Sequence, residues 1–365
     1  MNAGRLDRAR AETEASGWAG VLATPGINFT WLTGLALDRS ERLTCLGVPR
    51  RGTPWIVCPA FEAERLGAAL AGIEIISWEE SDDPFALAAR QCAAATGPWA
   101  LEPTTEWHDG TRLMAAMPAT AVEDGAALFA ALRRRKDAGE IQALRRAIAD
   151  AWAVYDAILP ELAPGATERE VADRVLALFG ARGCQGWALV QFGPGSAVPH
   201  GESGARALEP GQAVLFDWGG WRDGFTADLT RTIWWEGGSV PAADAPAPFR
   251  AIQELVRSAQ RAALERAGPG VACGAVDAAA RDVITAAGHG PQFTHRLGHG
   301  LGLEIHEAPY LVTGSPVPLA PGDVVTVEPG VYLPGILGVR WEDDVLVTDG
   351  GIEVLSHRAA TEEAP

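Results

Sequence analysis

The sequence predicts two domains, a small α/β domain over residues 1–130 and a larger α+β domain over residues 131–365. Three observations lead to this division. The chain has 365 residues, which is long for one domain and sufficient for two. Short apolar runs alternate with helical segments in the first third of the chain. From Trp187 onward, strand-like runs are joined by turns rich in glycine and proline, with two helical segments between them.

The first domain is expected to alternate strands and helices. Residues 19–35 and 41–59 predict strands with turns, and the sequence PRRG at 49–52 predicts a hairpin turn in the second segment. A further strand and turn are expected at 99–107. Apolar residues at helical spacing predict helices at 60–72, 83–95 and 109–117.

The second domain is expected to begin with a long amphipathic helix. Apolar residues between Ile141 and Ile158 recur on one helical face, and Asp137 and Glu140 have the spacing of a capping box. A second amphipathic helix is expected to end at Gly183. Helices covering one mostly antiparallel sheet would complete the domain. The strands are expected at 187–193, 212–221, 224–235, 324–333 and 338–348, and the further helices at 249–268 and 274–288.

Composition argues against several classes of partner. The formal charge is −17, from 30 basic and 47 acidic side chains, whereas nucleic acids and anionic membranes require a basic surface. The chain has no run of about 18 apolar residues, so no transmembrane helix is expected. The N-terminal segment lacks the apolar centre of a signal peptide, which predicts a cytoplasmic protein. The five cysteines are scattered, which predicts buried free thiols.

Four acidic residues of the second domain stand at the ends of predicted strands. Asp217 ends an apolar run, and Asp228 follows eleven positions later, after a glycine-rich segment suited to a tight hairpin. Two carboxylates on paired strands repel each other unless a cation lies between them. Glu328 ends a valine-rich strand, and Glu342 lies on another strand with Arg340 two positions earlier on the same face.

Histidines cluster in the segment HRLGHGLGLEIHE. His295, His299 and His306 fall within it, although the whole chain has only seven histidines, and its glycines allow the imidazoles to approach one point. Taken singly, an aspartate after a strand is usually a turn residue, and a histidine beside glycines is usually a structural hydrogen-bonding group. Taken together, four carboxylates and His299 form an oxygen-rich ligand set that suits a pair of Mn²⁺, Co²⁺ or Zn²⁺ ions about 3.5–4 Å apart.

At these residues the chain resembles the pita-bread metallopeptidases, in the branch of Xaa-Pro dipeptidases (prolidases) and Xaa-Pro aminopeptidases. The motifs FDWGGWRDGFTADLTRT, GHGLGLEIHE, TVEPGVY and GVRWEDD match in order and spacing. NFTWLTGL and KDAGEIQALRRA resemble segments of the family's N-terminal domain and linker helix. The resemblance implies a creatinase-like N-terminal domain, a pita-bread catalytic domain and a homodimer.

The resemblance also implies roles for individual residues. Asp228 and Glu342 would bridge two metal ions, and Glu328 would take the proton from a hydroxide-forming water held by both ions. His306 lies where the family places the histidine that stabilises the tetrahedral intermediate. The implied metal ligands are Asp217, Asp228, His299, Glu328 and Glu342.

Three further residues match an outer set of the family's site. His200 corresponds to a further active-site histidine, and His295 corresponds to one that lines the proline pocket. Both histidines are also compatible with a role in shaping the pocket only. Arg340 corresponds to an arginine that orients the carboxylates.

The expected activity is hydrolysis of the bond before proline in a dipeptide, with longer peptides as the alternative substrates. Prolidases often carry a basic residue shortly after the second HE motif, where it reads the dipeptide's carboxylate. Here residues 306–322 contain Tyr310 and neither arginine nor lysine. Arg39 and Arg42 are candidates for that role, and an ordinary solvated loop is the alternative explanation for them.

Two other functions stay open at this point. One is a creatinase-type hydrolase that does not cleave peptides, and the other is a binding module that uses the cleft without catalysis. Such relatives are expected to lack some of the ligands, whereas all five ligand positions are occupied here. Metal bound without any hydrolysis of Ala-Pro would favour either of them.

Overall fold

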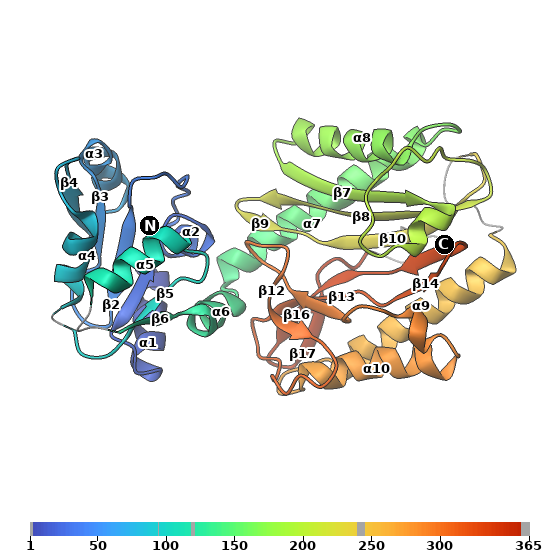
Figure 1. The fold of residues 1–365 in the computed structure, drawn as a ribbon. Helices are drawn as coiled ribbons and strands as arrows, with labels where there is room; N and C mark the ends of the chain where they lie inside the picture. Colours follow the sequence, from blue (N-terminus) through green and yellow to red (C-terminus); the bar gives the residue numbers. More distant parts are fainter. Residues whose placement is uncertain (1–2, 94, 118–120, 239–244, 359–365) are drawn as a thin grey trace. The chain divides into compact units, whose positions relative to one another are not determined.

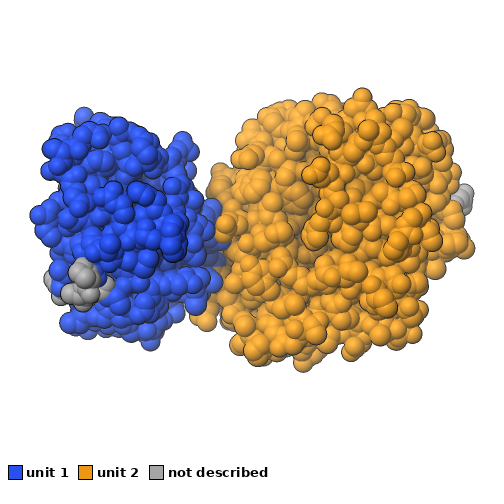
Figure 2. All heavy atoms as spheres, in the orientation of Figure 1, with its two compact units in different colours: residues 1–133 blue, residues 134–365 orange. Residues whose placement is uncertain are grey.

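The computed structural model describes residues 3–93, 95–117, 121–238 and 245–358. The chain divides into two compact units between Arg133 and Arg134 (Figure 2). The division after residue 130 that the sequence suggests falls inside helix α6 (Ala126–Arg134), and as a domain boundary it stays a prediction.

The first unit is an α/β structure around a six-stranded sheet with the order β4-β3-β2-β1-β5-β6 (Figure 1). The segment with the PRRG turn joins β2 and β3 as an antiparallel hairpin, as predicted. β1 also pairs with β2 in antiparallel fashion, and the remaining pairs are parallel. The strands are β1 (Gly20–Ala23), β2 (Cys45–Pro49), β3 (Trp55–Pro59), β4 (Glu74–Trp78), β5 (Trp99–Leu101) and β6 (Val122–Asp124); the helices before α6 are α1 (Ala3–Ala15), α2 (Ile27–Thr33), α3 (Ala60–Ala69), α4 (Pro84–Cys92) and α5 (Trp107–Ala116).

Helices α1 and α2 of this unit were not expected from the sequence, and neither was most of α6. The segment INFTWLT was expected to be extended, but it forms α2, in which Thr30 and Thr33 donate hydroxyl hydrogen bonds to carbonyls four residues earlier. Gly34 ends the helix with a φ of 76°, which glycine adopts without strain. Helix α1 was missed, although the buried residues Leu6 and Thr13 lie seven positions apart, a spacing that places them on one helical face.

The second unit contains two antiparallel sheets and a two-stranded ribbon instead of the single sheet that was predicted. The predicted strand at 324–333 is interrupted at Glu328-Pro329, where proline has no N–H to donate. The predicted strand at 338–348 is interrupted at Trp341-Glu342. A backbone bridge between Thr230 and Glu342 connects the two sheets. The first sheet contains β7 (Gln185–Phe192), β8 (Gln212–Arg222), β9 (Phe225–Thr226) and β10 (Leu229–Trp235); the second contains β11 (Gly298–Gly300), β12 (Glu307–Leu311), β13 (Val324–Val327), β16 (Asp343–Thr348) and β17 (Gly351–Val354); the ribbon is β14 (Gly330–Leu333) and β15 (Leu337–Arg340).

Four long helices cover these sheets. The predicted capping box is present at the start of α7, where Asp137 Oδ1 accepts the Glu140 N–H and Glu140 Oε2 accepts the Asp137 N–H, each at 2.9 Å. Helices α7 and α8 pack against the first sheet, and α9 packs with α10 beside the second (Figure 1). The helices are α7 (Ala138–Ile158), α8 (Glu168–Ala181), α9 (Ala247–Arg266) and α10 (Cys273–Ala286).

Two predictions from composition bear on the whole chain. All five cysteines are buried free thiols, as expected. Within the described ranges, no helix combines the length and the apolar character that crossing a membrane would require.

Candidate active site

A cavity of about 660 Å³ opens in the second unit, between residues that come from both sheets. Strands β7 and β8 and the residue just before β10 contribute one wall, and the segments around β11, β13 and β15 contribute the other. Nearly all of the site residues predicted from the sequence line this cavity: Asp217, Asp228, Glu328, Glu342, His200, His295, His299, His306 and Arg340.

Close strand pairing brings Asp217 and Asp228 to the same wall. Asp217 lies in β8 opposite Thr230 of β10, and Asp228 directly precedes β10. A Cβ atom on Gly219 would lie 1.9 Å from the Ala227 carbonyl oxygen. Glycine at this position therefore allows the chain just before Asp228 to approach β8.

The two glutamates occupy the points at which strands are interrupted. The Glu342 N–H donates to the Thr230 carbonyl at 3.1 Å, and the Thr230 hydroxyl donates to Glu342 Oε2 at 2.6 Å. The Glu328 N–H donates to the Leu297 carbonyl at 2.8 Å, which ties Glu328 to the histidine segment. These backbone contacts explain why residues far apart in sequence present their carboxylates to one cavity.

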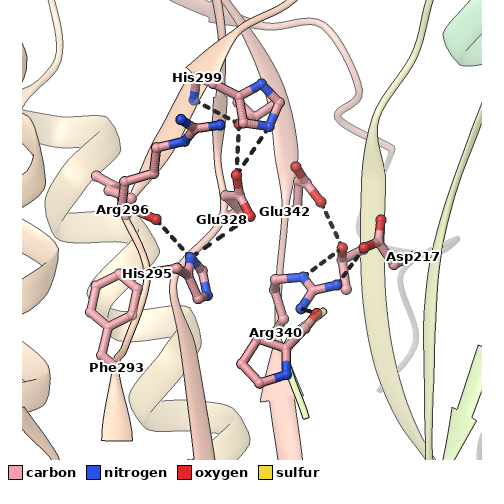
Figure 3. Close-up of polar contacts among 12 residues, drawn as sticks. Asp217, Phe293, His295, Arg296, His299, Glu328, Arg340 and Glu342 are labelled. Carbon is pink, nitrogen blue, oxygen red and sulfur yellow. Dashed lines mark hydrogen bonds and ion pairs between the residues drawn. The ribbon is translucent and has the colours of Figure 1, made fainter. Parts of the chain in front are cut away.

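His299 faces the carboxylates with its Nε2 atom. That atom lies 3.2 Å from Glu328 Oε1 (Figure 3). It also lies 3.5 Å from Asp228 Oδ2. Its Nδ1 atom lies 3.0 Å from the Gly300 carbonyl oxygen, which can only accept, so Nδ1 carries a proton. Nε2 is therefore the atom of this imidazole that can coordinate a cation.

The cluster leaves buried negative charge without donors. Asp217 Oδ1 and Glu342 Oε1 are buried and have no hydrogen-bond partner among the described residues. Burial, together with the charge of Glu342, raises the pKa of Asp228 well above its usual value, and burial and Glu328 do the same to Glu342. Ligand atoms of Asp228, His299 and Glu342 lie within 4.8 Å of one another. This donor set fits a divalent cation, which would supply the missing positive charge.

Arg340 organises the opposite side of the cluster. Its guanidinium pairs with Asp217 (Figure 3). It also donates from Nε to the Thr230 hydroxyl at 3.1 Å and from Nη1 to the Tyr332 hydroxyl at 2.8 Å. Tyr332 in turn lies 2.8 Å from His295 Nε2. The sequence reasoning missed Tyr332, although it ends the motif TVEPGVY that was used to recognise Glu328.

The remaining histidines surround this core. The His306 ring lies 4.3 Å from the His299 ring at an angle of 84°, and burial and His299 lower its pKa to about 4. His306 is therefore neutral near pH 7. His295 Nδ1 lies 4.0 Å from Glu328 Oε2, while His200 lines the cavity from the segment after η2 (Gly193–Ala197).

The two arginines proposed to read a substrate carboxylate belong to the first unit. Arg39 donates to the Pro25 carbonyl at 2.9 Å and to the Thr104 hydroxyl at 2.8 Å. Arg42 donates to Glu80 at 2.8 Å and also pairs with Glu41. Each has partners within its own unit, and their role toward substrate stays a prediction.

Comparison with known proteins agrees with these features. A model of metallopeptidase family M24 matches residues 142–349, and one of the creatinase/prolidase N-terminal domain matches residues 5–135. A probable dipeptidase PepE from Mycobacterium tuberculosis is 37% identical over 95% of this chain and 92% of its own length. An Xaa-Pro dipeptidase from Lactobacillus helveticus is 33% identical over 91% of this chain and 90% of its own length.

A solved structure supports the same relationship. The crystal structure of dipeptidase PepE from Mycobacterium ulcerans has a TM-score of 0.90 and 36% identity to this chain, covering 98% of it and 96% of the other. The resemblance seen in the sequence and the expected fold, a creatinase-type domain before a pita-bread domain, are thereby confirmed. Because a family model covers more than half of its length, the chain belongs to metallopeptidase family M24 and is a peptidase.

Proposed function

We propose that the protein is a metal-dependent Xaa-Pro dipeptidase, which hydrolyses the bond before proline in dipeptides. The observation that carries the proposal is the buried cluster of Asp228, His299 and Glu342, whose negative charge has too few donors without a cation. The name of the Lactobacillus helveticus relative supports the choice of Xaa-Pro dipeptides. An Xaa-Pro bond has no amide N–H, so its recognition cannot rest on strand-like backbone pairing.

The proposed site holds two divalent ions, Mn²⁺, Co²⁺ or Zn²⁺. When bound, such ions acidify water and polarise a carbonyl group. The proposed ligands are Asp217, Asp228, His299, Glu328 and Glu342.

The protein's own groups have separate roles in this proposal. Burial raises the pKa of Glu328, but nearby positive charge, including that of Arg340, outweighs burial and leaves that pKa below its ordinary value. Glu328 is therefore an ionised group that can accept a proton from water. Neutral His306 donates a hydrogen bond to the oxygen on which charge develops. Arg340 holds Asp217 in place, while His200 and His295 line the substrate cavity.

A substrate series tests the activity. We expect the enzyme with added Mn²⁺ to hydrolyse Ala-Pro, to cleave Ala-Pro-Ala much more slowly and to leave Pro-Ala intact, and we expect a chelator to abolish hydrolysis. A preference for Ala-Pro-Ala would favour an Xaa-Pro aminopeptidase. Metal binding without hydrolysis of either peptide would favour a creatinase-type hydrolase or a binding module.

Three properties inferred from the sequence belong to the same proposal. We propose a homodimer located in the cytoplasm, without nucleic acid or membrane as a partner. Light scattering during size-exclusion chromatography tests the assembly, and a monomer mass at micromolar concentration would contradict it.

A further inference from the structure

The cavity contains two arginines, and only one of them has its charge balanced. Arg340 is buried and donates to Asp217, Thr230 and Tyr332. Arg296 lines the same cavity from the segment between His295 and His299 (Figure 3). Within the described part of the chain, the Arg296 guanidinium has no carboxylate within ion-pair distance. A half-buried cation in this position is available to an anionic group of a ligand.

An aromatic ring holds Arg296 in place. Its guanidinium lies over the Tyr310 ring, 4.6 Å from the ring centroid. Tyr310 belongs to β12 and pairs with His299 of β11, so the ring is attached to the strand beside the metal-ligating segment. Stacking engages the face of a guanidinium and leaves its N–H donors in the plane free to bind a carboxylate through two parallel hydrogen bonds.

The charges in the cavity indicate why a substrate carboxylate would need Arg296. Asp217, Asp228, Glu328 and Glu342 all face the cavity. Two divalent ions would balance only the charges of these four carboxylates, so a free substrate carboxylate entering beside them needs a further cation. Residues 306–322 provide no arginine or lysine, and Tyr310 lies among them. Arg340 is committed to other partners.

We propose that Arg296, stacked on Tyr310, binds the C-terminal carboxylate of the dipeptide and so makes the site selective for dipeptides. This inference rests on the proposed function. In a longer or amidated peptide the proline carboxyl is an amide, which offers no charge to the guanidinium. Arg296 is thus a specificity-determining residue, and Tyr310 is a positioning residue that acts through it.

Kinetics with a charged and a neutral substrate test the proposal. For the metal-loaded Arg296→Gln variant we expect KM for Ala-Pro to rise by roughly tenfold to a hundredfold, the loss typical when the charged hydrogen-bonding partner of a carboxylate is removed. The kcat value should change much less, and cleavage of Ala-Pro amide should be unaffected. Tyr310→Leu should raise KM for Ala-Pro by a smaller factor, whereas Tyr310→Phe should leave it unchanged. Arg145→Gln, which removes a surface arginine paired with Glu353, is the matched control.

Binding of the product gives a readout that does not depend on hydrolysis. Calorimetry on the metal-loaded parent should show tighter binding of proline than of prolinamide, and Arg296→Gln should remove that difference. Unchanged proline affinity in Arg296→Gln, or an equal loss for proline and prolinamide, would overturn the proposal. Loss of the preference in Arg39→Gln or Arg42→Gln, with Arg296→Gln unaffected, would assign carboxylate binding to the first unit. Failure of the parent to hydrolyse any Xaa-Pro peptide would refute the proposed function, while the proline measurement would still decide the role of Arg296.

Discussion

Each unit of the chain buries a glutamate, Glu102 in the first unit at 1% exposure and Glu342 in the second at 2%. Glu102 is surrounded by donors. The Thr24 hydroxyl and the Asn28 amide each donate to it at 3.1 Å, and Thr104 adds its N–H and its hydroxyl. This is the usual way in which a folded protein stabilises a buried carboxylate.

Glu342 is satisfied in a different way. One of its oxygens accepts from Thr230, but Oε1 has no partner among the described residues, and Asp228 lies beside it. Hydrogen-bond donors from the protein satisfy the carboxylate of Glu102, which is a structural acid. The carboxylate of Glu342, in the candidate site, needs a cation instead. The difference gives a physical criterion for separating structural from metal-binding carboxylates.

The largest effect is expected from removing a charge of the candidate site. Asp228→Asn should lower kcat/KM for Ala-Pro by about a thousandfold, because the metal contributes several kcal/mol of transition-state stabilisation. Metal content measured on the purified variant should fall in parallel. Glu102→Gln is the control, and it should retain both metal and kcat. Full metal content and normal activity in Asp228→Asn would contradict the distinction between structural and metal-binding carboxylates.

A second kind of buried acid, paired with a protein cation, lies close to the site. Lys136 Nζ donates to Glu307 Oε1 at 2.7 Å, and both side chains are buried. Lys136→Met should lower the free energy of unfolding by about 3 kcal/mol, because it leaves the Glu307 charge buried with less compensation. Urea denaturation measures this loss. The double variant Lys136→Met/Glu307→Gln should recover most of it, and equal losses in both proteins would show that the pair is not coupled.

A smaller loss is expected at the structural glutamate. Glu102→Ala should lower the free energy of unfolding by about 2 kcal/mol, because it leaves the Asn28 amide and the Thr24 hydroxyl with fewer acceptors. Addition of a chelator should not change this difference in urea denaturation. A chelator-dependent difference would mean that Glu102 is coupled to the metal site.

The smallest effect concerns the pH dependence of a structural acid in the second unit. Burial raises the pKa of Asp150, but hydrogen bonds from Arg222 and Arg182 outweigh it and leave that pKa below its ordinary value. Such a group adds stability above its unfolded-state pKa and loses it as the pH falls through the folded-state value. Asp150→Asn should therefore cost about 1 kcal/mol at pH 7 and nothing in strong acid.

The pH dependence of stability should have the opposite sign for Glu342 in protein from which a chelator has removed the metal. Its folded-state pKa is raised, so the stability it contributes is present below its unfolded-state pKa and is lost as the pH rises. Without metal, Glu342→Gln should become more stable relative to the parent between pH 4 and pH 8. Thermal unfolding at several pH values measures both trends. A parallel trend for Asp150→Asn and Glu342→Gln would contradict the distinction between the two kinds of acid.

Local patterns account for the features that the sequence predicted well. The capping box of Asp137 and Glu140 and the helix after it depend on contacts within a few residues, so spacing alone indicates them. The turn between β2 and β3 is equally local. The acids of the candidate site were found because Asp217 and Glu328 each stand at or near the end of an apolar run in a motif of fixed spacing.

By itself, then, the sequence determined the two-domain organisation, the family and the residue types that surround the cavity. Only the tertiary structure decided that INFTWLT is helical, that the expected single sheet is divided, and that Arg296 rests on Tyr310. The physical reason is distance along the chain. The hydroxyl of Thr230 reaches Glu342 across 112 positions, and contacts of that range depend on how strands pack and not on the preferences of neighbouring residues.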